Sequence, residues 1–136
     1  MGKTIILTHG ELAECLYDSV GLFIADRTGL EALGLGVDIE EFRMSLRRMV
    51  LEDSEKDFLI LADLFGGTPF NIAASLINEA QKQGKCMEVI TGVNLPMLLE
   101  IVPLIPEMNC QSLKKIALEV GTEGIRDLMA ELSGER

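Results

Sequence analysis

The sequence predicts an α/β protein, a three-layer sandwich in which helices cover both faces of a four-stranded parallel sheet. Short β-branched or apolar runs of strand length alternate with segments that repeat apolar residues at the helical period. This alternation is typical of a parallel sheet with right-handed crossovers. The length of 136 residues suits a single core. We therefore assign residues 1–132 to one domain and expect residues 133–136 to fray.

The first half of the chain alternates three predicted strands with two predicted helices. In order, these are a buried central strand at 4–8, a helix from 11 to about 26, a weak, glycine-containing strand at 30–37, a helix capped by Asp38, and a buried strand at 57–62. The second helix carries three arginines, Arg43, Arg47 and Arg48. We expect them on a solvated surface, with binding of a partner as the alternative.

The second half continues the alternation. In order, it predicts a helix from Pro69 to about Gln83 ended by Gly84, a strand at 86–90, a loop at 91–94, a short helix beginning at 95–99 and stopped by Pro103 and Pro106, and a helix capped by Ser112 that runs to about Val120. Gly121 and Gly124 interrupt the last pattern. The segment Ile125–Leu132 therefore stays open between a helix and a short edge strand.

Composition restricts the classes of function. Hydrophobic residues make up 48% of the chain, yet no apolar run approaches the roughly 20 residues that span a bilayer, and the start lacks the pattern of a signal peptide. We expect a cytoplasmic protein. A net charge of −10 disfavours nucleic acid and anionic lipid and suits a basic protein partner. The cysteines Cys15, Cys86 and Cys110 are interpreted as small buried hydrophobes, not as a disulfide framework or a zinc site.

A stretch of nine residues, DLFGGTPFN, follows the third predicted strand. It begins with the carboxylate of Asp63, and Gly66 and Gly67 then let the backbone turn and approach a ligand closely. Thr68 and Pro69 suit the N-cap and the first helical position. A strand, a tight turn and a helix N-terminus together form an anion site in many α/β sheets. The alternative is an ordinary connection that binds nothing.

The one histidine of the chain, His9, ends the first predicted strand. If the strand order is 2-1-3-4, the order reverses between the strands that end in His9 and Asp63, and such a reversal is where α/β sheets bind ligands. An aspartate that accepts the Nδ1 proton fixes the tautomer and leaves Nε2 as a nucleophile toward phosphorus. The phosphoryl oxygens would then meet the amides of Gly66 to Thr68 and the hydroxyls of Thr68 and Thr8.

Other interpretations of the histidine have less support. It could be only a hydrogen-bonded loop residue. One histidine without clustered cysteines or carboxylates gives too few ligands, so we expect no metal. The chain contains no GxSxG of a serine hydrolase, and the turn after the first strand reads THGELAE in place of the GxGxxG of a dinucleotide fold. We expect no cofactor.

Three motifs together resemble the IIA component of the mannose family of the bacterial phosphoenolpyruvate-dependent sugar phosphotransferase system. They are Thr8-His9-Gly10, the stretch Asp63–Asn71, and Thr91–Met97 (TGVNLPM), in the same order along nearly the whole chain. The resemblance implies a parallel sheet of order 2-1-3-4. It also implies a homodimer in which a C-terminal strand, here Glu123–Leu128, is exchanged onto the sheet of the partner.

The resemblance also implies a function. His9 would take a phosphoryl group from the phosphohistidine of HPr and pass it to a IIB component, which phosphorylates the sugar brought in by membrane IIC and IID partners. Asp63 would orient the histidine, Thr68 would bind the phosphate, and Asn94 and Pro96 would line the rim. Some members continue through a linker into a IIB domain. This sequence ends without one, so IIB is expected as a separate polypeptide unless the sequence is part of a longer chain.

Exposed apolar side chains would suit transient contacts with two protein partners in turn. Phe65, Leu64 and Met97 are the candidates; packing in the core is the alternative, and we favour it for Leu64. Two other functions stay open. One is a regulatory module whose phosphorylated His9 reports sugar or nitrogen status by binding proteins, and the other is a domain that binds a small anion without covalent chemistry. The sugar is not identified, because in this system the membrane components recognise it.

Overall fold

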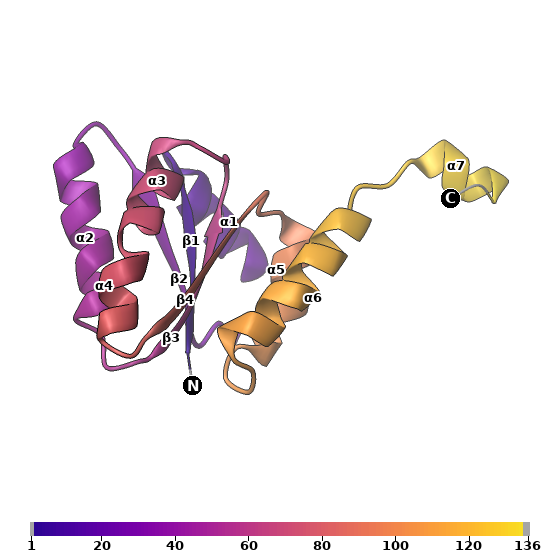
Figure 1. Cartoon of the computed structure of the whole chain (residues 1–136). Helices are drawn as coiled ribbons and strands as arrows, with labels where there is room; N and C mark the ends of the chain where they lie inside the picture. Colours follow the sequence, from indigo (N-terminus) through magenta and orange to yellow (C-terminus); the bar gives the residue numbers. More distant parts are fainter. Residues whose placement is uncertain (1, 135–136) are drawn as a thin grey trace.

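A parallel sheet of strand order β2-β1-β3-β4 forms the centre of the molecule (Figure 1). A computed structural model of the chain describes residues 2–134. The strands are β1 (Lys3–His9), β2 (Leu30–Leu35), β3 (Asp57–Ala62) and β4 (Cys86–Thr91). All three pairings are parallel, which confirms the predicted sheet and its order.

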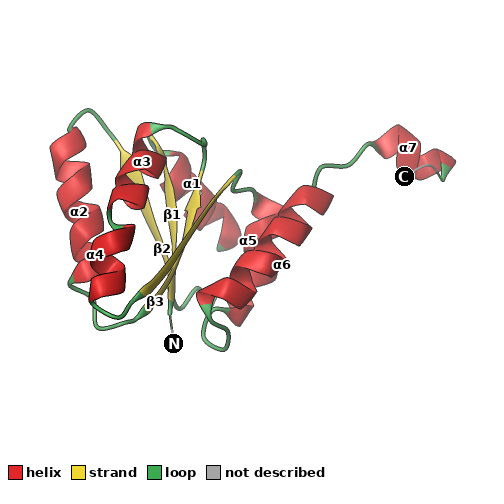
Figure 2. Cartoon of the chain, in the orientation of Figure 1, coloured by secondary structure: helices red, strands yellow, loops and turns green. Residues whose placement is uncertain are grey.

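Helices cover both faces of this sheet, as predicted (Figure 2). One face carries α2 (Ile39–Leu51), α3 (Thr68–Ser75) and α4 (Ile77–Lys82). The other carries α1 (Leu12–Val20), α5 (Leu95–Ile101), a short 3-10 helix (Val102–Leu104) and α6 (Cys110–Glu123). A last helix, α7 (Leu128–Ser133), projects away from the sheet (Figure 1).

Two apolar cores lie on the two faces of the central strands. Along β1, Ile5 and Leu7 pack toward α2 and α3, whereas Ile6 packs toward α1 and α5. All three side chains are fully buried, as are Ile60 and Leu61 on β3. Burial on both faces explains why these strands read as continuous apolar runs, and each such side chain contributes about 1.5–3 kcal/mol by leaving water. The sheet is therefore a rigid support for the loops at its ends.

The predicted helix from Pro69 to Gln83 is divided into α3 and α4 at Leu76. The hydroxyl of Ser75 donates to the carbonyl of Ile72 at 2.6 Å, which is the acceptor that the amide of Leu76 would use in a continuous helix. That amide bonds to the carbonyl of Ala73 instead. The sequence pattern of apolar residues did not reveal this local competition.

Other helix ends were partly predicted. The carboxylate of Asp38 accepts the amide of Glu41 at 3.0 Å, so its capping role is confirmed, and Gly84 follows α4 with a left-handed φ of 76°, as expected of a helix end. The first helix was predicted too long, since α1 ends at Val20. Thr68 is the first residue of α3 and Gly67 is its cap, so the prediction of Thr68 as the cap was wrong.

The start of α6 also differs from the prediction. Its cap is Asn109, whose side chain accepts the amide of Ser112 at 2.8 Å, so Ser112 lies in the first turn. The helix runs through Gly121 to Glu123, past the predicted end. A Cβ on Gly121 would lie 2.7 Å from the Cε of Met97 on α5. Gly121 therefore serves close packing between the two helices rather than helix termination.

The C-terminal segment is helical where the sequence left the choice open, because α7 spans Leu128–Ser133. Residues 124–127 lie between α6 and α7 without regular structure, so the segment predicted as an exchanged strand is not a strand in this single chain. In the predicted frayed tail, Ser133 ends α7 and Gly134 follows, while residues 135–136 lie outside the described residues. Within residues 2–134, no helix has the length and apolar character to cross a membrane.

Candidate functional site

His9 and Asp63 meet at the carboxyl edge of the sheet, at the reversal of strand order. The register pairs Leu7 of β1 with Ala62, the last residue of β3, so Asp63 follows β3 beside the last two residues of β1. The Nδ1 of His9 lies 3.0 Å and 3.2 Å from the two carboxylate oxygens of Asp63. The backbone amide of His9 also donates to this carboxylate at 3.0 Å. One carboxylate thus holds both the ring and the main chain of the histidine.

The contact defines which ring nitrogen is free. An ionised carboxylate only accepts hydrogen bonds, so the Nδ1 beside it carries the proton and Nε2 keeps its lone pair. Burial raises the pKa of Asp63, but the hydrogen bonds from the amide and ring of His9 outweigh this effect, and the net pKa lies below the ordinary value. Asp63 is therefore ionised at neutral pH. The His9 side chain is 44% exposed, which leaves it open to a partner.

The ring of His9 lies against the turn that starts α3. A Cβ on Gly67 would lie 2.8 Å from Cε1 and 3.3 Å from Nε2 of the ring, so only glycine permits this approach. Gly66 has a left-handed φ of 82°, the conformation that glycine adopts at least cost. The side chain of Asn71 donates to the carbonyl of Gly66 at 3.1 Å and holds the turn. Nε2 is thus placed beside the N-terminus of a helix.

That helix N-terminus supplies donors for an anion. The amides of Thr68 and Phe70 belong to the first turn of α3, where amides have no acceptor within the helix. The positive end of the helix dipole lies at the same place. The amide of Gly67 is used within the turn, because it donates to the carbonyl of Leu64 at 3.1 Å. The donors that remain free at this helix end are therefore the first helical amides, and the partly buried Thr68 begins the same turn.

Three other predicted site residues have structural contacts elsewhere. The hydroxyl of Thr8 is fully buried and accepts the amide of Ala13 at 2.7 Å, so it holds the start of α1. Asn94 caps α5 and donates to the carbonyl of Gly121 on α6 at 3.0 Å. Pro96 lies in the first turn of α5. Asn94 thus fastens the start of α5 to α6.

Exposed apolar side chains follow the ends of the strands at this edge of the sheet. Leu64 is 58% exposed and Phe65 is 75% exposed, both directly after Asp63. The prediction that Leu64 packs in the core was wrong, and Met97, a predicted contact residue, is only 2% exposed. Leu12 and Val37, which sequence reasoning missed, are exposed just beyond the ends of β1 and β2. We call Leu12, Val37, Leu64 and Phe65 the apolar rim; the signal that could have found it is the apolar residues that come two or three positions after the strand ends.

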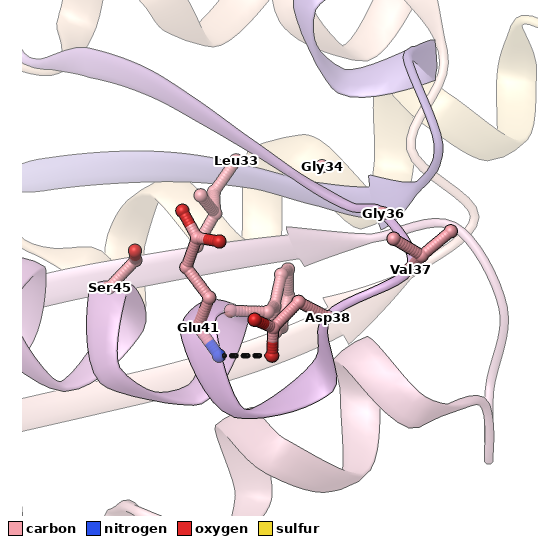
Figure 3. A pocket seen from close by; sticks show the side chains of 8 residues that line it. Leu33, Gly34, Gly36, Val37, Asp38, Glu41 and Ser45 are labelled. Atoms are coloured by element: carbon pink, nitrogen blue, oxygen red, sulfur yellow. Dashed lines mark hydrogen bonds between the residues drawn. The ribbon is translucent and has the colours of Figure 1, made fainter.

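A hollow of about 270 Å³ lies beside the end of β2 and the start of α2 (Figure 3). Figure 3 shows the carboxylate of Asp38 bonded to the amide of Glu41 at this hollow. The eight residues that line it include these two acids and no basic side chain or histidine. It therefore does not suit a phosphoryl anion, and the exposed His9 surface remains the candidate site.

Two of the three arginines on α2 form ion pairs at the surface. Arg47 forms an ion pair with Glu79 on α4 at 2.8 Å, and Arg43 pairs with Glu40. This agrees with the solvated surface predicted for the second helix. The partner-binding alternative for these arginines stays a prediction.

Comparisons with known proteins agree on one family. Residues 3–118 match EIIA-man, described as the PTS system fructose IIA component. The fructose-specific EIIA component of Bacillus subtilis is 36% identical over 110 residues, which cover 76% of this chain and 70% of that protein. The mannose-specific EIIAB component of Escherichia coli is 30% identical over 134 residues, and the match covers 93% of this chain and 39% of that longer protein. The crystal structure of an EIIA component from Streptococcus agalactiae has a TM-score of 0.85 at 30% identity and covers 96% of this chain and 99% of its own.

Proposed function

Since the chain belongs to the EIIA-man family of phosphotransferase-system IIA components, we propose that it is a phosphohistidine carrier. In this role, Nε2 of His9 accepts a phosphoryl group from phospho-HPr and passes it to a separate IIB component. Membership supports a phosphoryl-carrier role in sugar uptake. The observation that carries the residue assignment is the bond from the ring and amide of His9 to Asp63.

The geometry suits an in-line transfer between two imidazoles. The Nε2 lone pair of His9 attacks phosphorus and the bond between phosphorus and the donor histidine breaks. The donor ring, protonated and positive while it carries the phosphoryl group, leaves as a neutral imidazole. The His9 ring becomes positive, and the Asp63 carboxylate stabilises that charge. The amides of Thr68 and Phe70 donate to the phosphoryl oxygens as the three oxygens pass through the planar arrangement of the transition state. Donor and acceptor are chemically alike, so the step needs positioning and charge stabilisation more than a strong base.

The surroundings of the histidine suit protein partners. The ring is exposed at the carboxyl edge of the sheet, and the apolar rim offers side chains that would contact a docked surface. A net charge of −10 favours a basic partner. We infer that HPr and IIB use this edge in turn, while the membrane IIC and IID components act further along the relay. The relay operates in the cytoplasm.

We also infer a homodimer formed through the C-terminal segment. Ile125, Leu128, Met129 and Leu132 are all exposed on the segment that projects from α6 (Figure 1). Apolar side chains on a projecting segment gain by burial against another surface. Removal of residues 125–136 should convert a dimer into a monomer in sedimentation equilibrium. A full-length chain that already sediments as a monomer would contradict the inference.

The proposed function is tested by intact mass after incubation with phosphoenolpyruvate, enzyme I and HPr. The wild type should gain one phosphoryl group that is labile to acid and stable to base, and His9→Ala should gain none while keeping its fold. Prompt loss of the group on addition of a cognate IIB would favour the carrier over a regulatory phospho-sensor. An unmodified chain beside phosphorylated HPr would reject the carrier and favour non-covalent anion binding.

A further inference from the structure

Two cysteine sulfurs lie in contact at the edge of the sheet opposite His9. The Sγ atoms of Cys86 and Cys110 are 3.1 Å apart, although the residues are 24 positions apart in sequence. Cys86 begins β4 and Cys110 begins α6, so both are held by regular elements. The sequence interpretation as separate buried hydrophobes did not anticipate this pair. It was also wrong for Cys15, which is exposed on α1.

The pair is held from one side by Asp57. This residue is paired with Cys86 in the register of β3 and β4, and its carboxylate accepts the amide of Cys110 at 2.5 Å. The Cys110 side chain is 1% exposed, whereas Cys86 is partly exposed. A hollow of about 290 Å³ is lined by Asp57 and Asn109, the neighbours of the pair, and by neither cysteine. A small reagent therefore reaches the pair through the partly exposed Cys86.

We propose that Cys86 and Cys110 form a reversible intramolecular disulfide by exchange with a low-molecular-weight disulfide such as oxidised glutathione. The thiolate of Cys86 attacks one sulfur of the reagent, forms a mixed disulfide and releases one thiolate. The Cys110 thiol then gives up its proton and attacks the Cys86 sulfur, and the second reagent thiolate leaves and takes up a proton. In sum, two protein thiols and one disulfide give one protein disulfide and two small thiols.

The order of these steps follows from the surroundings. Burial raises the pKa of the Cys110 thiol far above its usual value, and the Asp57 carboxylate and Cys86 act in the same direction. The partly exposed Cys86 is therefore the sulfur that meets the reagent first. Cys110 follows within the protein, where the short separation of the sulfurs replaces a bimolecular encounter.

A metal site is the competing interpretation of the same residues. Donor atoms of Asp57, Cys86 and Cys110 lie within 4.8 Å of one another. However, two Zn–S bonds of about 2.3 Å at a tetrahedral angle need sulfurs roughly 3.8 Å apart, and the observed pair is closer. One oxygen of Asp57 is already bonded to an amide. The contact between the sulfurs favours the disulfide.

The bond would join the first residue of β4 to the first residue of α6 and close the segment between them, which contains α5. Closing a loop of this length should raise the melting midpoint by roughly 5–10 °C. His9 lies at the other edge of the sheet, so acceptance of a phosphoryl group should not change. The disulfide is thus a modification site independent of the proposed transfer.

The test is made in a Cys15→Ser background, which leaves only the pair. The full chain is equilibrated with oxidised glutathione, quenched with acid and alkylated in denaturant before mass measurement. The expected product has lost about 2 Da and takes no alkyl group, and a reducing agent restores two alkylation sites. Cys110→Ala should instead stop at the mixed disulfide on Cys86. Alanine is used at this buried position because it removes the thiol without adding a hydroxyl.

Two results would overturn the proposal. One is a Cys15→Ser protein that keeps both thiols or retains glutathione under conditions in which a model dithiol is fully oxidised. The other is stoichiometric Zn²⁺ binding that is lost in Cys86→Ser and that protects both thiols from exchange, which would assign the pair to a metal. Neither result depends on His9, so the proposed phosphoryl transfer is tested independently, by the mass assay with enzyme I and HPr.

Discussion

Replacement of Gly67 by alanine should impair transfer while leaving the fold intact. The backbone at this position has φ −75° and ψ 169°, which any residue adopts, so alanine adds no backbone strain. Its Cβ would, however, lie 2.8 Å from Cε1 of His9 and 3.3 Å from the carbonyl oxygen of Leu64. The collision falls on the ring that carries the proposed chemistry.

The size of the effect follows from these contacts. Ordinary contact between carbon atoms begins near 3.4–3.5 Å, so the His9 ring must retreat by about 0.6 Å or more. Misplacement of a reacting group by about 1 Å costs up to a hundredfold in rate. We expect Gly67→Ala to slow phosphoryl acceptance about 10–100-fold, which corresponds to about 1.4–2.7 kcal/mol of activation free energy. Stability should change by no more than about 1 kcal/mol, since alanine loses only the weak capping preference of glycine.

The assay is the rate at which phospho-HPr transfers its group, followed by quenched-flow mass spectrometry, with thermal melts on the same samples. Gly36→Ala is the matched control, because a Cβ there meets nothing within 4 Å and its φ is not left-handed. It should behave as the wild type in both measurements. A folded Gly67→Ala protein with the wild-type rate would refute the view that the turn fixes the His9 ring.

Three further predictions use other contacts of the described residues. Asp63→Asn should slow acceptance roughly 10²–10⁴-fold in the same assay, because an amide nitrogen facing Nδ1 favours the tautomer with the proton on Nε2. Thr68→Val should cost less, about 1–3 kcal/mol, since it removes one donor, and a rate equal to that of Asp63→Asn would contradict this ranking. Lys85→Met should lower the free energy of unfolding in urea by about 1–3 kcal/mol, because the buried ammonium donates to the carbonyls of Val50 and Asp53 near the end of α2. An unchanged midpoint of urea unfolding would show that these two bonds do not stabilise the fold.

The contact between Asp63 and His9 also makes the free energy of unfolding depend on pH in the acid range, in a direction that can be worked out. Burial raises the pKa of Asp63 and the bonds from His9 lower it by more, so the folded value lies below the ordinary one. The stability from this contact is therefore complete above the unfolded pKa of about 3.9 and is lost as the pH falls through the folded pKa. Asp63→Asn should melt with a shallower pH dependence below about pH 4 than the wild type. Parallel curves would show that the contact contributes nothing to stability.

The sheet and the principal pair could be predicted because both depend on local patterns and a general rule of topology. The apolar runs of β1 and β3 are buried on both faces, and the reversal of strand order brings their ends together. Because His9 and Asp63 stand at the ends of those two strands, the strand order alone predicts that they meet. The glycine turn before α3 was also predictable, since a left-handed φ and a close approach both favour glycine.

The remaining features depend on tertiary contacts that one sequence does not show. The division between α3 and α4 coincides with the bond from the Ser75 hydroxyl to the carbonyl of Ile72. The hydroxyl of Thr8 could equally have faced an anion, but the position of α1 directs it to an amide. Gly121 resembles a helix end, yet it permits contact with α5. The pairing of Cys86 with Cys110 needs the position of α6 on the sheet, which no spacing in the sequence encodes.

The hold of Asp63 on His9 reconciles two demands that usually conflict. A relay between two proteins needs an exposed ring, and in-line transfer needs a ring that does not move. Exposure alone would leave the side chain free to change rotamer, but here one carboxylate bonds the main-chain amide and Nδ1 together, and Gly67 closes the other side of the ring. These restraints come from the sheet end and the turn, and they still leave 44% of the His9 side chain exposed to a partner. The Asp63 carboxylate and the Gly67 turn thus hold the His9 ring in place without covering it.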